Sequence, residues 1–384
     1  SYGLQGNIDK NTSPFLLGNY RVENILPGGS EDMIDVSGAP NKKLRWEKTH
    51  SVNAGFDFAV LNQAINLSVD YYYRKGVDLI GTQMLPLETG FEMLTVNWAS
   101  MQNQGVEVAL STRNVHTKNF MWTTNFNFAY NNNKVLKEAL REDALEPGRE
   151  GYPVGALFAL KTAGLDEEGY PMFQDKDGKA VSAMEFFKLQ EWGFGATDLT
   201  ARERRELYTY VGTADCPYTG GFNNTFTYKA FELGVNFSFD FGGKVRSQPT
   251  YSIVDFDKGR NTNRDILNRW TPENTETIFP VLLSQNERLD EYMWYSNQNE
   301  IYRNLDIWIR DLNYVRLQNI RLGYTLPTNF SRTLGMTSAT VAIEGRNLLV
   351  FGSSYKNYLD PETMSNAYAT PAPKSVTLSL NLIF

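Results

Sequence analysis

The stretch "FELGVNFSFDF", residues 231–241, alternates apolar and polar side chains over its whole length. Successive side chains of a β-strand point to opposite faces of the sheet. A period of two therefore predicts a strand with one apolar face and one polar face. The apolar positions are Phe231, Leu233, Val235, Phe237, Phe239 and Phe241, and the polar face carries Glu232, Gly234, Asn236, Ser238 and Asp240.

The same alternation recurs along the chain, in "VNAGFDFAV" (52–60), "INLSVDYYYR" (65–74), "WTTNFNFAY" (122–130) and "KSVTLSLNLIF" (374–384). We predict strands near 44–60, 64–80, 101–114, 120–136, 218–229, 231–245, 309–326, 338–351 and 374–384, with the end of one more at Ser1–Gly3. Parity changes within two of them, near Gln318 and around Gly345. A β-bulge at each place would restore one apolar face, because an extra residue reverses the facing.

The connections between these strands are short and long in turn. Tight links are expected at 61–63, 116–119 and Lys229–Ala230, and a modest link at about 327–337. The links 81–100, 137–217, 246–308 and 352–373 are long. Outer-membrane β-barrels have short periplasmic turns and long extracellular loops, so the order of the links favours that class.

Composition supports an all-β chain. The 384 residues include 21 Tyr, 23 Phe and 7 Trp, which fit pleated surfaces. A net charge of −7 disfavours nucleic-acid binding, since phosphate backbones require clustered Lys and Arg. No apolar run reaches about 18 residues, the length that a transmembrane helix needs.

A soluble β-sandwich would also alternate, with its apolar face turned inward. The expected strands of about nine to eleven spanning residues fit a tilted membrane strand, whereas soluble strands average about five or six. Aromatic residues gather near strand ends, as interface girdles do; they are Trp46, Tyr71–Tyr73, Trp122, Tyr130, Trp308 and Tyr324. We therefore predict an antiparallel transmembrane β-barrel. A secreted glycan-binding sandwich and a plugless porin or adhesin barrel remain the alternatives.

Several segments, in order, resemble SusC/RagA-type TonB-dependent outer-membrane transporters. They include "LRWEKTHSVNAGFDF", "DYYYRKGVDLI", "NQGVEVAL", "NYVRLQNIRLGYTLP", "GRNLLVF" and "YLDPE", and they extend from about Leu44 over nearly the whole chain. The resemblance implies that residues 1–384 are the C-terminal portion of a barrel of about 22 strands. On this interpretation the plug domain, the TonB-binding segment and the first strands lie outside the sequence.

The resemblance also implies a function and partners. Such proteins import oligosaccharides or oligopeptides across the outer membrane of Gram-negative bacteria, driven by the TonB–ExbB–ExbD complex. A SusD-like surface lipoprotein covers the extracellular mouth. The resemblance further implies that an aromatic C-terminal strand, here Leu380, Leu382 and Phe384, is read by the barrel-assembly machinery.

Candidate contact residues divide into two groups. Aromatic residues in or beside the long links could stack on a ligand or pack loop against loop; these are Trp192, Phe194, Tyr218, Trp270, Trp294 and Tyr295. Acidic residues on the polar faces are expected to line the lumen or touch the plug; these are Asp57, Asp70, Glu107, Glu232 and Asp240.

Catalysis is not expected, and neither are a cofactor or a metal. "LDEEGYP" (165–171) and "RERREL" (202–207) lie in one long link and fit a solvated loop surface and a short helix. "DKDGK" (175–179) fits a turn better than a calcium loop, because Phe173 stands where an EF-hand needs an acidic residue. Cys216 is the only cysteine, and neither His50 nor His116 lies near it in sequence to activate it.

Overall fold

The protein is described from a computed structural model. The described residues are 1–8, 12–26, 29–36, 38–91, 93–140, 142–190, 197–247, 259, 264–282, 303–352, 360–363 and 369–384.

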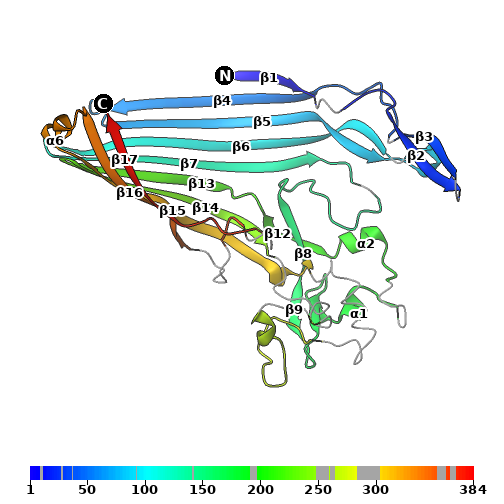
Figure 1. Ribbon diagram of the computed structural model, residues 1–384. Coiled ribbons are helices and arrows are strands. Elements are labelled where there is room, and N and C mark those ends of the chain that lie inside the picture. Colours follow the sequence, from blue (N-terminus) through cyan, green and yellow to red (C-terminus); the bar gives the residue numbers. More distant parts are fainter. Residues whose placement is uncertain are drawn as a thin grey trace.

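One curved antiparallel sheet of ten strands dominates the structure (Figure 1). Each strand pairs with its neighbours in the order β1-β4-β5-β6-β7-β13-β14-β15-β16-β17. The sheet stays open at β1 and β17 among the described residues. The strands are β1 (Tyr2–Asn7), β4 (Glu47–Val60), β5 (Ile65–Met84), β6 (Met93–His116), β7 (Phe120–Lys137), β13 (Tyr218–Tyr228), β14 (Phe231–Arg246), β15 (Ile309–Thr325), β16 (Ser338–Phe351) and β17 (Ser375–Ile383).

The nine expected strands and the strand end at Ser1–Gly3 are confirmed as these ten strands. The main error concerns residues 81–100, which were expected to form a loop. Instead β5 and β6 continue past the rest of the sheet, and their ladder runs on to the pair Met84–Met93. Proline cannot donate a hydrogen bond to a ladder, and Pro86 is the only proline in this region. The pairing of β5 with β6 can therefore continue up to the residues next to Pro86.

The pairing register fixes which side chains share a face. Phe237 stands opposite Phe222, and Phe222 stands opposite Phe126 on the next strand. Asn236 in turn stands opposite Asn223, which stands opposite Asn125. We call the face that carries Phe237 the outer face and the face that carries Asn236 the inner face.

Both expected changes of parity coincide with irregular pairing. Along β15, the partners of β14 pass from Asn319 to Leu317, so Gln318 is the extra residue and the predicted bulge is confirmed. Along β16, the partners of β15 pass from Arg346 to Leu349. This shift falls just after Gly345, at Asn347, whose φ of 53° lies in the left-handed region that Asn tolerates.

Tight connections lie at one end of the sheet (Figure 1). Leu61, Asn62 and Gln63 turn between β4 and β5 with φ of 53°, 55° and 60°. Lys229 turns between β13 and β14, and the short helix α6 (Thr328–Thr333) connects β15 to β16. The short and long links of the sequence therefore separate to opposite ends of the sheet, as predicted.

A hairpin and a compact unit occupy the other end (Figure 1). The hairpin pairs β2 (Gly18–Leu26) with β3 (Gly29–Val36). The second body, which we call the loop unit, contains two small sheets and two short helices. Its elements are β8 (Ala156–Leu160), β9 (Thr162–Leu165), β10 (Pro171–Gln174), β11 (Ala180–Val181), β12 (Tyr208–Thr213), α1 (Ala183–Phe186) and α2 (Ala201–Arg205).

The loop unit has its own hydrophobic core, which joins two distant links. Leu160 of the first link pairs with Leu305 of the second, and Thr162 Oγ1 donates to Asp306 Oδ1 at 2.6 Å. Phe173 and Trp308 are 0% and 1% exposed in this core. The prediction that Trp308 belongs to an aromatic girdle is therefore wrong, because Trp308 packs against Phe279 rather than facing a membrane.

The helices and turns of the loop unit follow local sequence signals. Thr200 and Glu203 form a capping box that starts α2, which confirms the helix expected in "RERREL". Asp175 Oδ1 accepts the backbone N–H groups of Asp177 and Lys179, so "DKDGK" is a turn, as predicted. None of the described helices is long and apolar enough to cross a membrane.

Candidate functional site

Two aromatic rows bound the apolar band of the outer face. Near the tight turns, Phe231 packs against Tyr324 in a tilted arrangement, with ring centroids 4.6 Å apart. At the other end, Tyr218 stacks on Tyr130, with centroids 5.1 Å apart. The register aligns this second row as Tyr71, Val106, Tyr130, Tyr218 and Phe241.

The spacing of the two rows fits the thickness of a membrane. Phe231 and Phe241 are ten residues apart along β14. Ten residues extend about 34 Å along a strand. A strand tilted by about 40° covers roughly 26 Å of height over that length, and the apolar band of an outer-membrane barrel is about 25 Å tall.

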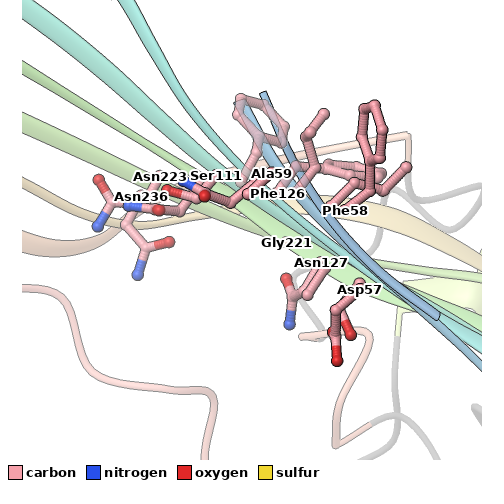
Figure 2. A pocket seen from close by; sticks show the side chains of 16 residues that line it. Asp57, Phe58, Ala59, Ser111, Phe126, Asn127, Gly221, Asn223 and Asn236 are labelled. Atoms are coloured by element: carbon pink, nitrogen blue, oxygen red, sulfur yellow. The ribbon is translucent and has the colours of Figure 1, made fainter. Parts of the chain in front are cut away.

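The inner face has a different chemistry. A groove of about 550 Å³ crosses β4 to β14, and the polar residues in its lining include Asp57, Ser68, Ser111, Asn127, Asn223 and Asn236. Figure 2 shows Asp57 and Asn127 projecting to one side of the strands, away from the phenylalanine rings. Gly221 in its lining has no room for a side chain, because a Cβ there would lie only 2.7 Å from the backbone oxygen of Phe237. Side chains of this kind suit a hydrated passage rather than a packed core.

The five acidic candidates all occupy the inner face. Asp70 stands opposite Glu107, and Asp57 stands opposite Ser68, next to Asp70. Glu232 forms an exposed ion pair with Arg321 at 3.0 Å. Asp240, Asp70 and Glu107 line a second hollow of about 420 Å³. That these carboxylates line the lumen or touch the plug stays a prediction.

A buried ion-pair network on β15 was not foreseen. The side chain of Arg316 is 2% exposed, and its guanidinium binds Asp360 through Nη2. Arg316 Nε also donates to Glu362 Oε1 at 2.8 Å. The hydroxyl of Tyr314 lies 2.5 Å from Asp240 Oδ2 and 3.1 Å from Glu362 Oε1. We call these residues the Arg316 network.

The Arg316 network attaches the segment 360–363 to the inner face. Asp360 additionally accepts the backbone N–H groups of Glu362 and Ala372, at 3.1 and 3.2 Å. A buried guanidinium needs such partners, because an unpaired charge in a dry site is costly. This part of the connection between β16 and β17 therefore folds back against the wall rather than extending into solvent.

The sequence contained both halves of the network. Arg316 has the inner-face parity of β15, and Asp360 and Glu362 belong to "YLDPE". An Arg on one strand and two carboxylates 44 and 46 residues later do not form a recognisable spacing, so only the fold brings them together.

The aromatic candidates are placed less favourably than expected. Tyr218 lies on the outer face in the second aromatic row, so we do not retain it as a ligand contact. Trp270 is half-buried, and its ring covers Gly169, where a Cβ would lie 2.5 Å from the indole. That arrangement is packing of loop against loop. The remaining candidates, Trp192, Phe194, Trp294 and Tyr295, lie outside the described residues.

The last strand presents an apolar edge. Leu380 is 63% exposed and Phe384 is 82% exposed, while Leu382 pairs opposite Ala339 of β16. β17 pairs with β16 alone among the described strands. A role of these three residues in barrel assembly stays a prediction.

Taken together, an antiparallel sheet with an apolar band of membrane height, a polar inner face and long links at one end defines an outer-membrane β-barrel segment. A secreted sandwich would need a second sheet packed on the apolar face, but the large described sheet carries that face exposed.

Comparison with known proteins shows what the chain is similar to. Residues 16–157 match the family model described as TonB dependent receptor-like, beta-barrel. TonB-dependent receptor P3 of Formosa agariphila is 26% identical over 412 residues, covering 100% of this chain and 39% of the relative. TonB-dependent receptor SusC of Bacteroides thetaiotaomicron is 26% identical over 365 residues, covering 89% of this chain and 32% of the relative.

A solved structure shares the fold. The structure of the RagAB peptide transporter superposes with a TM-score of 0.74 at 23% identity, covering 99% of this chain and 40% of that chain. The resemblance read from the sequence is thus confirmed: the chain is similar to TonB-dependent receptors, SusC among them, and it shares its fold with the RagAB transporter. It spans about two fifths of the length of the relatives that it covers fully.

Proposed function

We propose that this chain forms part of the wall of an outer-membrane importer that moves oligosaccharides or oligopeptides inward with energy delivered through TonB. The observation that carries the proposal is the inner-face groove of about 550 Å³, with amide and hydroxyl side chains in its lining, behind an apolar band of membrane height. Amide and hydroxyl side chains along a passage can exchange hydrogen bonds with a polar solute without holding it tightly.

The proposed mechanism assigns the chain a passive role. The ligand enters from the end of the barrel that carries the loop unit and is held there by loops from several links. TonB, acting with ExbB and ExbD, displaces a plug that lies in a part of the protein outside this chain. The ligand then passes along the inner face, where Asn127, Asn223 and Asn236 replace part of its hydration.

The partner that we propose is a SusD-like surface lipoprotein that closes the mouth. Support comes from the relatives, which include a receptor named SusC and a transporter named RagAB. The loop unit offers a folded surface at that end of the barrel, with its own core. Co-purification of the lipoprotein with the full-length protein tests this partner directly.

Uptake measurements with two neighbouring residues test the passage. We expect Asn223→Trp to lower the uptake of a labelled oligopeptide or oligosaccharide severalfold, because the indole would fill the groove. Phe222→Trp is the matched control, since Phe222 precedes Asn223 on β13 but carries its side chain on the outer face. Equal uptake by both variants and the wild-type protein would contradict the proposal, and deletion of TonB should abolish uptake in all three.

A further inference from the structure

A row of basic and neutral polar residues crosses the outer face beyond the second aromatic row. The register places His50 of β4, Lys75 of β5, Gln102 of β6 and Lys134 of β7 side by side. No register shift interrupts these ladders between Tyr71 and Lys75 or between Tyr130 and Lys134. The row therefore has the same facing as the aromatic row, and we call it the cationic row.

Its height places it at the membrane surface. Lys75 and Lys134 each lie four residues beyond a tyrosine of the aromatic row, Tyr71 and Tyr130. Four residues extend about 13 Å along a strand. At a tilt of about 40° this is roughly 10 Å of height. A lysine side chain can bend back over several ångströms, so the ammonium groups reach the level of lipid headgroups.

The charge of the cationic row is not balanced within the described part of the chain. Lys48, one step beyond His50, is paired with Asp78 at 3.5 Å. Lys75 and Lys134 have no ion pair to any described residue, and Lys134 is exposed. The outer-face positions between the two rows are Val52, Tyr73, Gln104 and Asn132, none of which is acidic.

The basic character is local. The whole chain carries a net charge of −7, and the inner face of the same strands carries Asp57, Asp70 and Glu107. Two unpaired cations about two strand spacings apart, roughly 10 Å, stand next to hydrogen-bonding amides. A phosphate group and the sugar hydroxyls around it would complement this surface in charge and in hydrogen bonding.

We propose that the cationic row binds a phosphate-bearing glycolipid of the outer leaflet. The acyl chains of that lipid would cover the apolar band below, and its phosphate would sit between Lys75 and Lys134. Basic residues near a charged membrane surface each strengthen binding by about fivefold. The site concerns the attachment of the barrel to its membrane and does not depend on the transported substrate.

The test uses the full-length protein, purified in detergent and freed of lipid, and measures binding of phosphorylated lipid A by native mass spectrometry. We expect the double variant Lys75→Gln/Lys134→Gln to bind about 25-fold more weakly, from roughly fivefold for each lysine. Arg74→Gln is the matched control, because Arg74 precedes Lys75 but lies on the inner face, over the ring of Tyr72. This variant should bind as the wild-type protein does.

Two further probes identify the ligand group. The same lipid after removal of its phosphates should bind the wild-type protein as weakly as phosphorylated lipid binds the double variant. Inorganic phosphate at the same concentration should not displace the lipid. The proposal is overturned if the double variant binds like the wild type, if dephosphorylated lipid binds equally, or if free phosphate competes. Should the double variant fail to fold, the exposed single variant Lys134→Gln must still show a loss of about fivefold.

Discussion

Phe173 in the loop unit has no exposed surface, whereas Phe231 on the outer face of the sheet is 49% exposed. The two regions treat large hydrophobic side chains in opposite ways. The loop unit buries them in a core, as a protein in water must. The sheet turns them outward and carries the buried Arg316 network on its inner face, as a wall in lipid does. One chain is thus built for two solvents, water and lipid, and the variants below test this difference between the loop unit and the sheet.

The largest effect is expected in the core of the loop unit. Phe173→Ala should lower the free energy of unfolding of this unit by about 5 kcal/mol, since a fully buried ring would leave a cavity. Hydrogen exchange of the loop-unit amides measures the change. Met184→Ala, at a side chain that is 46% exposed, should change it by less than about 0.5 kcal/mol. Similar losses in the free energy of unfolding for both variants would show that the loop unit has no buried hydrophobic core.

The Arg316 network tests burial inside the wall. Arg316→Met should cost about 4 kcal/mol, because Asp360 would remain buried without its cation. Arg321→Met is matched on the same strand and the same face. It should cost about 1 kcal/mol or less, because the Arg321 and Glu232 side chains are 38% and 53% exposed. Urea unfolding of the full-length protein in lipid vesicles measures both, and equal costs would refute the buried network.

Charge on the two faces of β14 should have unequal consequences. Phe237→Arg should destabilise the barrel by about 3 kcal/mol, since an outward cation near the middle of the band meets hydrocarbon. Asn236→Arg, one residue earlier, places the cation on the inner face. We expect it to be tolerated there, with little change in the unfolding midpoint. A larger loss of stability from Arg at position 236 than at position 237 would show that the asparagine side, not the phenylalanine side, meets lipid.

The smallest effect concerns acid and helix α2. Glu203 accepts hydrogen bonds from the Thr200 backbone N–H and hydroxyl, and these contacts lower the pKa of its carboxyl to about 2 from an ordinary value near 4.5. Because the folded pKa is depressed, the ionised group stabilises α2 above pH 4.5, and this contribution is lost as the pH falls from 4.5 towards 2.

Amide exchange in α2 should therefore accelerate over that pH range relative to the rest of the loop unit. Glu203→Gln retains a capping side chain without a titratable group, so it should remove the pH dependence. Persistence of the same acceleration in the Gln variant would assign it to another group.

Much of the wall could be predicted from the sequence, because the alternation that sets each strand and its facing lies within a single segment. The alternation in residues 231–241 sets strand and facing together, and the bulge at Gln318 follows from a change of parity that one strand displays by itself. The acidic residues Asp57, Asp70 and Glu107 were placed on the inner face by the same rule.

The rest depends on contacts between distant segments. Trp308 stands next to a strand, as a girdle residue would, yet the core of the loop unit buries it against Phe279. Tyr218 follows a long link, but pairing with Tyr130 places it on the outer face. Arg316 meets Asp360 only because the connection between β16 and β17 folds back. No periodicity within one segment carries that information.

The central claim is that the phenylalanine side of this sheet meets lipid and the asparagine side meets water. The most direct measurement places a single fluorescent label at Phe237→Cys or at Asn236→Cys, with Cys216 replaced by Ala, in the full-length protein in lipid vesicles. We expect a lipid-soluble quencher to act on the label at position 237 and aqueous iodide to act on the label at position 236. Quenching of position 237 by iodide, with position 236 open to the lipid quencher, would contradict the account.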